Sequence, residues 1–195
     1  MDTYEAIRTV LAVRQYQDKA VPPDAIRKIV EAGRLTASSK NGQPWHFIVV
    51  EDRETLRQLG SMARTGPYIA QAAFAIVVAI EQGKFGESDA SRAIQSMVLE
   101  AWEEGIGSNW VGFYGLENVK SFLGIPQDME VFAIIPFGYP LKQIGKGKKQ
   151  RKPLTEGPAA SALASLSNNY SSPSFPLPRG IGGRPPWRIP SPGCA

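Results

Sequence analysis

Residues 72–81 read AAFAIVVAIE, and every side chain from Ala72 to Ile80 is apolar. The β-branched valines and isoleucines in this run are residues that strands favour. A continuous apolar run of this length, bounded by polar residues, predicts a strand that is buried in the domain. The segments around this strand then decide which class of fold it belongs to.

Strands and helices alternate on both sides of this run. HFIVVE at 46–51 and EVFAIIPFGYP at 130–140 predict two more strands, and SNWVGFY at 108–114 predicts a short one. Apolar spacing and capping residues predict helices over 2–12, 23–34, 53–63, 88–104 and 116–124. Two helices precede the first strand, and no G-x-G-x-x-G follows a strand. The pattern therefore predicts a layered α/β or α+β domain without an opening dinucleotide-binding unit.

Two of the helices carry specific expectations. In the helix of 2–12, we expect Ile7, Val10 and Leu11 on the buried face. In the long helix of 88–104, we expect Ser88 or Asp89 to cap the amino end. The residues expected to face the core from that helix are Ile94, Met97, Val98, Ala101 and Trp102.

The composition of the chain changes near Gly157. Residues 158–195 are rich in proline, serine and glycine without a sustained period, so we expect a disordered tail after a folded domain of residues 1–157. The tail carries three arginines and no acidic residue, and it supplies most of the net charge of +4. The basic balance is therefore a property of the tail, and no nucleic-acid partner is expected.

Several classes of protein are excluded. No apolar run approaches the roughly 18 residues of a membrane span, and the N-terminus is acidic where a signal peptide is basic, so we expect a cytoplasmic protein without a membrane partner. With one cysteine, Cys194, and one histidine, His46, no internal disulfide and no metal site are expected. His46 is a candidate proton donor, although a structural or rim role is favoured. No Ser/His/Asp set is recognisable, and a catalytic pair of carboxylates is neither supported nor excluded.

Two polar segments are candidates for ligand binding. TASSKNGQPW at 36–45 offers more hydrogen-bonding groups than a turn requires. In GKGKKQRKP at 145–153, Lys149 and Arg151 lie two residues apart, so in an extended chain they project to one side and suit a phosphate. A solvated basic connection explains the second segment equally well.

Three segments together resemble the nitroreductase family of flavin mononucleotide (FMN) enzymes. Residues 14–50 are similar to that family's Arg-x-aromatic, DKPV and APSSxNxQPW elements. The matching residues are Arg14, Tyr16, Asp18, Lys19, Val21, Ser38, Ser39, Asn41, Gln43, Pro44 and Trp45. EEGIGSNWVGFY at 103–114 resembles the GLGTxWxG segment, and QRKPL at 150–154 resembles the basic segment after the last strand. The order and spacing match over roughly residues 3–156.

The resemblance implies an α+β fold of three layers (α/β/α), with a mixed central sheet wrapped by helices in an intertwined homodimer. It implies two FMN molecules at the dimer interface, each touched by both subunits. The cofactor-binding residues that it implies are Arg14, Ser38, Ser39, Asn41, Gln43, Gly107, Ser108, Asn109, Lys149 and Arg151. No catalytic side chain is implied, because the flavin carries the chemistry.

Each group of these residues has an implied role. Arg14 would reach the pyrimidine edge of the flavin or its ribityl-phosphate arm. Ser38, Ser39 and Asn41 would approach the flavin, with the serines acting from the other subunit. The backbone of 107–109 would line the reactive N5 edge, and Lys149 and Arg151 would hold the phosphate.

The chain departs from the family pattern before Val13. Two basic residues and a serine usually stand where this chain has Val10, Leu11 and Ala12, and a proline usually stands at Ala37. A lost charged hydrogen bond costs about 1.5–3 kcal/mol, so the loss of two is expected to weaken FMN binding by about two or more orders of magnitude. The tail also differs from the segment with which many members wrap their partner subunit.

The leading hypothesis is a flavin-dependent oxidoreductase that passes reducing equivalents from NAD(P)H through FMN to a flat acceptor such as a nitroaromatic or a quinone. The alternative is a non-catalytic or weakened flavin- or nucleotide-binding protein on the same fold, which Val10, Leu11 and Ala12 favour. An enzyme of the same superfamily that acts on another acceptor, or consumes flavin, stays open. A binder of nucleic acid or anionic surfaces through 145–195 has little support.

Overall fold

The computed structural model describes residues 2–112, 116–142 and 149–151. The chain divides into two compact units, Met1–Lys149 and Gln150–Ala195. In the second unit only Gln150 and Arg151 are described, so the fold given below is that of the first. The expected tail of 158–195, with its boundary at Gly157, lies outside the described residues and stays a prediction.

The described strands form one sheet in the order β1-β2-β4-β3. Its strands are β1 (Trp45–Val50), β2 (Phe74–Glu81), β3 (Gly107–Ser108) and β4 (Met129–Gly138). All three neighbouring pairs are antiparallel. Parallel pairing among the described residues is confined to an isolated bridge between Ala12 and Ser108.

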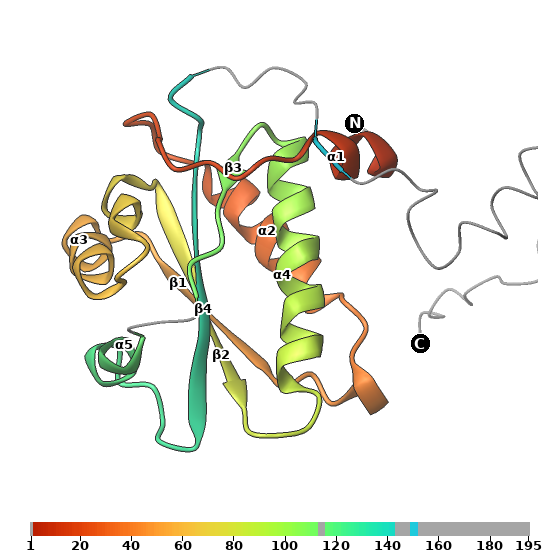
Figure 1. Cartoon of the computed structure of the whole chain (residues 1–195), viewed down its shortest axis with the longest axis vertical. Coiled ribbons are helices and arrows are strands. Elements are labelled where there is room, and N and C mark those ends of the chain that lie inside the picture. Colours follow the sequence, from red (N-terminus) through yellow and green to blue (C-terminus); the bar gives the residue numbers. More distant parts are fainter. Residues whose placement is uncertain (1, 113–115, 143–148, 152–195) are drawn as a thin grey trace, which may run out of the picture. The chain divides into compact units, whose positions relative to one another are not determined.

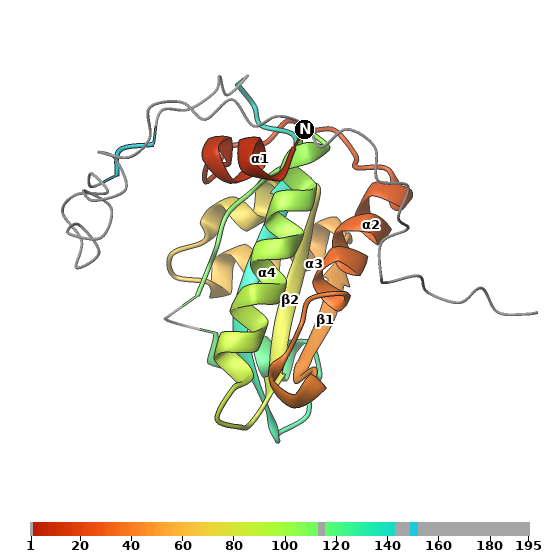
Figure 2. The same ribbon diagram turned by 90° about the vertical axis from the view of Figure 1, so that its right-hand side faces the viewer.

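Helices cover both faces of this sheet (Figure 1). They are α1 (Thr3–Thr9), α2 (Pro23–Arg34), α3 (Arg53–Met62), α4 (Gly86–Glu103) and α5 (Glu117–Phe122), with two short 3-10 helices, η1 (Ser39–Asn41) and η2 (Pro67–Gln71). One face packs against α2 and α4, which Figure 2 shows in front of the sheet, and the other packs against α3, α5 and η2. The expected three-layer α+β fold is confirmed, although the described strands pair antiparallel where a mixed sheet was expected, and the homodimer stays a prediction.

The central strand β2 explains why both faces need helices. Ile76, Val78 and Ile80 lie in the core shared with α2 and α4. Ala75, Val77 and Ala79 lie in the core shared with α3 and α5. Because successive side chains of a strand point to opposite faces, an unbroken apolar run can only be buried between two layers.

The amino end of α4 differs from its prediction. The helix begins at Gly86 after Phe85, and neither Ser88 nor Asp89 caps it. Asp89 lies inside the first turn and is only 1% exposed, because its carboxylate bonds to another segment. Of the residues predicted to face the core, Ile94, Met97 and Ala101 are fully buried, whereas Val98 and Trp102 are half-buried.

The first helix also differs from its prediction. It ends at Thr9, and its buried residues are Ala6 and Thr9, while Ile7 is 51% exposed. The reason is a polar anchor: the indole Nε1 of Trp102 donates to the Thr9 hydroxyl at 2.9 Å, which turns the Thr9 face inward. An apolar pattern over two turns leaves such a rotation undetermined.

The predicted strand of 108–114 is short in the structure. Within this stretch, β-pairing of the described residues is limited to β3 and to an isolated bridge between Val111 and Ile134. Residues 113–115 lie outside the described residues. Among the helices that the structure describes, none has the length and apolar character needed to cross a membrane.

Candidate functional site

The segment after α1 lies against β3. It brings together two parts of the predicted cofactor site, Arg14 and the backbone of 107–109. The amide of Val13 donates to the carbonyl of Ser108 at 2.8 Å. A Cβ atom on Gly107 would lie 2.4 Å from Val13 Cγ2, so only glycine allows this approach. Arg14 therefore follows directly on a contact with the 107–109 segment. Its side chain is exposed and has no hydrogen bond or ion pair to any described residue.

Two tyrosines lie beneath this segment. Tyr16 is buried and donates its hydroxyl hydrogen to the Val13 carbonyl at 2.7 Å. Burial raises the pKa of Tyr16 far above its ordinary value of 10.0, so it stays neutral. Tyr68, from η2, packs against the same cluster, and its hydroxyl accepts from Nδ2 of Asn109 at 2.5 Å. No sequence motif pointed to Tyr68.

Backbone amides add donors to this region. The amides of Asn109 and Val111 donate to β4 carbonyls of Pro136 and Ile134. Those of Trp110 and Gly112 have no acceptor among the described residues. The sequence placed the backbone wall at 107–109, and the free donors lie one to three residues later. Trp110 is half-buried and Gly112 is buried, so these amides are available to donate to a bound ligand or to water.

The basic residues predicted to hold a phosphate are placed differently. Lys149 donates from Nζ to the Ile7 carbonyl, in the last turn of α1, at 2.6 Å. Arg151 belongs to the second unit and donates to the carbonyl of its neighbour Gln150. Their joint action as a clamp therefore stays a prediction.

The apolar residues that depart from the family pattern follow directly on α1. Val10 forms the carboxyl cap of that helix, and Leu11 is half-buried like Val10. Ala12 is exposed and bridges to Ser108. This stretch therefore offers no charged side chain to a ligand.

The second predicted group forms a tight loop before β1. Lys40, Asn41 and Gln43 all have positive φ, at 54°, 55° and 48°. Non-glycine residues adopt this conformation at a cost of about 1–3 kcal/mol each, and such strain clusters at functional sites. The loop is closed by the amide of Gln43, which donates to the hydroxyl of Ser38 at 3.0 Å.

Asp89 anchors this loop to the amino end of α4. The amide and the hydroxyl of Ser39 donate to the two carboxylate oxygens of Asp89, at 2.9 and 3.1 Å. Burial acts to raise the pKa of Asp89, but the hydrogen bonds from Ser39 and the charge of Arg92 outweigh it and leave the pKa below 3.8. The Ser39 hydroxyl is therefore already engaged, whereas the Asn41 side chain stays exposed beside Gln43.

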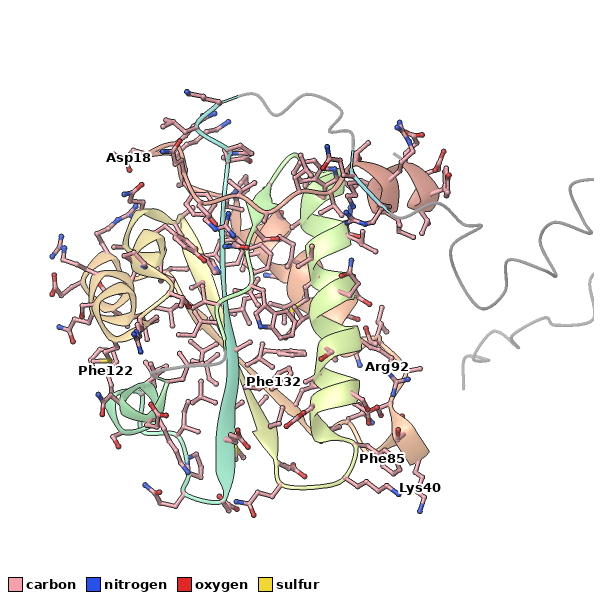
Figure 3. The ribbon with its side chains drawn as sticks, in the orientation of Figure 1. Asp18, Lys40, Phe85, Arg92, Phe122 and Phe132 are labelled. Carbon is pink, nitrogen blue, oxygen red and sulfur yellow. The ribbon has the colours of Figure 1, made fainter. Side chains whose placement is uncertain are left out.

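The two groups lie at opposite ends of α4. Ser39 bonds to Asp89 near the start of the helix, and the amide of Ile106 donates to Ala101 near its end. At about 1.5 Å per residue, these two helix positions are about 18 Å apart. Figure 3 shows Lys40 close to Phe85 and Arg92 at one end of α4, whereas β3 lies at the other end in Figure 1. One chain therefore does not bring all the predicted residues together.

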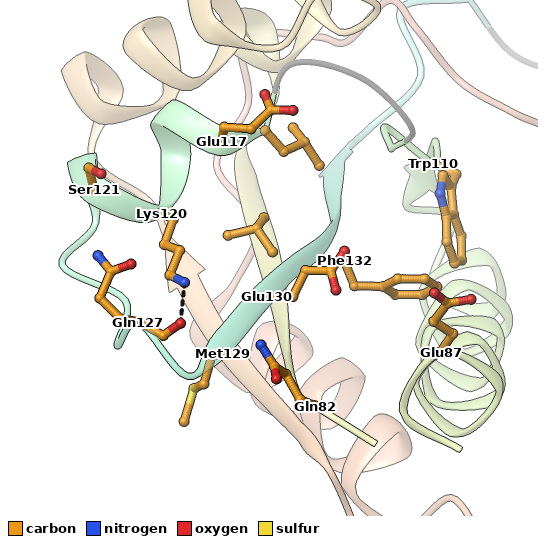
Figure 4. A pocket seen from close by; sticks show the side chains of 12 residues that line it. Gln82, Glu87, Trp110, Glu117, Lys120, Ser121, Gln127, Met129, Glu130 and Phe132 are labelled. Carbon is orange, nitrogen blue, oxygen red and sulfur yellow. Dashed lines mark hydrogen bonds between the residues drawn. The ribbon is translucent and has the colours of Figure 1, made fainter. Parts of the chain in front are cut away.

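A separate cleft of about 630 Å³ opens beside the start of β4 (Figure 4). Trp110 packs edge-on against Phe132 on its α4 side, with 5.4 Å between ring centroids, and Lys120 donates to the Gln127 carbonyl on its α5 side. Trp110 is half-buried, packs against the core shared with α2 and α4, and also lines this cleft. The cleft contains none of the residues predicted to bind the cofactor.

His46 stands on the exposed side of β1. Its Nε2 lies 3.1 Å from a carboxylate oxygen of Glu81 on the neighbouring strand. This pairing agrees with the favoured structural role at the rim of the domain.

Comparisons with known proteins agree with this geometry. The family model "Nitroreductase family" matches residues 8–88 and 66–139. A protein of Methanothermobacter thermautotrophicus, provisionally named an NADH dehydrogenase/NAD(P)H nitroreductase, is 36% identical over 154 residues, which cover 74% of this chain and 81% of that protein.

Solved structures share the fold as well. A nitroreductase, provisionally so named, in complex with FMN from Desulfovibrio desulfuricans has a TM-score of 0.72 at 28% identity, covering 80% of this chain and 95% of that one. An FMN-dependent nitroreductase from Clostridium difficile R20291 has a TM-score of 0.69 at 26% identity, with the same coverage.

Proposed function

The chain belongs to the nitroreductase family, and we propose that it passes reducing equivalents from NAD(P)H through FMN to a flat acceptor such as a nitroaromatic or a quinone. The family resemblance expected from the three sequence segments is confirmed. The chain is a flavin-dependent oxidoreductase that uses FMN and NAD(P)H, in keeping with the names of its relatives. A cytoplasmic location is proposed with it.

The groups left free around β3 fit FMN. A bound flavin supplies acceptance of a hydride from NAD(P)H and its transfer to a second molecule. The chain contributes the guanidinium of Arg14 and the amides of Trp110 and Gly112, none of which has a partner among the described residues. A cation and oriented N–H donors suit the polar edge of a flat ring that gains negative charge on reduction.

The proposal includes a homodimer with two shared sites, which the separation along α4 supports. The strained loop of 38–43 and the Arg14 end each carry only part of the implied set, and they lie near α4 positions that are about 18 Å apart along the helix. In a twofold dimer with the α4 helices running antiparallel, the loop of one subunit reaches the Arg14 end of its partner. Each flavin is then bound by Arg14 and 107–112 of one subunit and by 38–43 of the other.

The visible spectrum of the purified protein tests the cofactor. We expect a flavin band at about 450 nm, either as purified or after addition of FMN, and bleaching of that band by NADH or NADPH without oxygen. A protein that stays colourless and does not quench FMN fluorescence contradicts the proposal. Size-exclusion chromatography with light scattering gives the oligomeric state.

A non-catalytic flavin-binding protein is the second candidate. The absence of charge at Val10, Leu11 and Ala12 favours it, because these residues stand where the family has basic ones. It predicts that FMN binds but that NAD(P)H does not bleach it. The same spectrum therefore separates the two candidates.

A further inference from the structure

Tyr68 lies at the Arg14 end of the domain but belongs to none of the recognised motifs. Tyr68 packs against the cluster of Val13, Tyr16 and Ala72, and its hydroxyl oxygen accepts a hydrogen bond from Asn109 Nδ2 at 2.5 Å. No acceptor among the described residues takes its own hydrogen. Tyr68 is half-buried, so its hydroxyl hydrogen, which no described residue accepts, is available to a ligand.

Tyr16 provides an internal comparison in the same cluster. Its hydroxyl hydrogen is shared between the carbonyls of Val13 and Pro136, at 2.7 and 3.3 Å, so the fold itself uses that donor. Within the part of the chain that the structure describes, Tyr68 donates to no backbone carbonyl, although it packs against the cluster that contains Tyr16. A purely structural tyrosine at this position would gain by bonding a carbonyl, as Tyr16 does.

The position of Asn109 links Tyr68 to the candidate flavin site. Asn109 is buried, with 8% of its surface exposed, and it directly precedes Trp110, whose amide has no acceptor among the described residues. By donating to Tyr68, the Asn109 amide fixes the phenol oxygen and leaves its hydrogen directed elsewhere. The result is a set of donors, Tyr68 Oη and two backbone amides, without acceptors among the residues that are described.

We propose that Tyr68 donates a hydrogen bond to the bound flavin and that Asn109 orients its hydroxyl for this purpose. The inference rests on the proposed function and adds a residue to it. The flavin offers carbonyl and ring-nitrogen acceptors at its polar edge, and this edge gains negative charge on reduction. Because a hydrogen bond to a charged acceptor is roughly twice as strong as one to a neutral acceptor, Tyr68 favours reduced over oxidised FMN.

Tyr68→Phe in the full-length protein is the test. The measured quantities are the Kd for oxidised FMN, the visible spectrum of bound FMN, and the midpoint potential against a reference dye. We expect a shifted visible band and about tenfold less preference for reduced FMN, which corresponds to about 30 mV for a two-electron couple. Tyr4→Phe, on the exposed surface of α1 at 72% exposure, is the matched control and leaves all three unchanged.

Asn109→Ala provides a second, independent variant. It keeps the phenol but removes its orientation, so we expect a smaller change in the same direction, and no further change when it is added to Tyr68→Phe. If Tyr68→Phe fails to fold, as judged by circular dichroism, a wild-type potential and spectrum in Asn109→Ala overturns the proposal.

The outcomes separate the inference from the proposed function. A Tyr68→Phe protein with the wild-type spectrum and potential overturns the inference but not the proposed function. This holds also if the variant turns over the acceptor at a different rate. A wild-type protein that binds no FMN overturns both.

Discussion

At the scale of single residues, Gly107 is the described glycine whose added Cβ would have the shortest contact. A methyl group there would lie 2.4 Å from Val13 Cγ2. Val13 directly precedes Arg14 in the segment that lies against β3. Gly107→Ala is expected to lower the free energy of unfolding by about 1–3 kcal/mol, because the segment must move apart. Urea denaturation measures the change. Gly83→Ala is the matched control, since its added Cβ meets nothing within 4 Å; equal stability of the two variants would contradict the close approach.

Asp89 is the residue whose role depends on pH. Its folded-state pKa lies below 3.8, so its hydrogen bonds to Ser39 stabilise the fold fully above that pH and are lost as the pH falls through the lowered pKa. Asp89→Asn is therefore expected to be less stable than wild type at pH 7, and the difference should shrink below about pH 3.8. Urea denaturation between pH 3 and 7 measures this. A difference that does not depend on pH would show that the charge of Asp89 is not what anchors the loop.

At the scale of elements, the loop of 38–43 combines strain with closure by hydrogen bonds. Lys40, at φ 54°, has no local reason to adopt the left-handed conformation, unlike an asparagine, whose side chain tolerates it. Lys40→Gly removes strain of about 1–2 kcal/mol and adds about 0.5–1 kcal/mol of unfolded-state entropy, so we expect a small gain in stability.

A glycine in a regular element gives the opposite sign. Arg27→Gly, inside α2, is expected to destabilise by about 1 kcal/mol. Thermal denaturation of both variants measures the contrast. A Lys40→Gly protein that loses as much stability as Arg27→Gly would mean that residue 40 does not carry the strain.

Elements differ in how far the sequence determines them. β2 was predictable because an unbroken apolar run has few alternatives, and the two layers of helices follow from it. The amino end of α4 was not, because an aspartate that caps a helix and one that binds a loop 50 residues away look alike in sequence. Tyr68 left no local signal, since its relation to Asn109 exists only after η2 and β3 have docked.

At the scale of the whole molecule, the divided site makes a prediction about mixtures. A variant with Arg14→Ala damages one half of each site, and a variant with Ser38→Ala and Asn41→Ala damages the other. Alone, each variant is expected to bind FMN at least tenfold more weakly. The first variant loses a charged hydrogen bond, and the second loses more than one hydrogen bond. In a dimer that contains one chain of each variant, one site contains both sets of substitutions and the other site contains neither.

Dimers formed by refolding the two variants together should therefore recover tight FMN binding at one of their two sites. If the variants mix at random, half of the dimers are mixed, so about one quarter of all sites should bind FMN as wild type does. Fluorescence quenching with FMN measures this fraction, and each variant refolded alone is the control. A mixture that binds no better than its components would place the whole site within one chain, and the 18 Å along α4 would then need a different explanation.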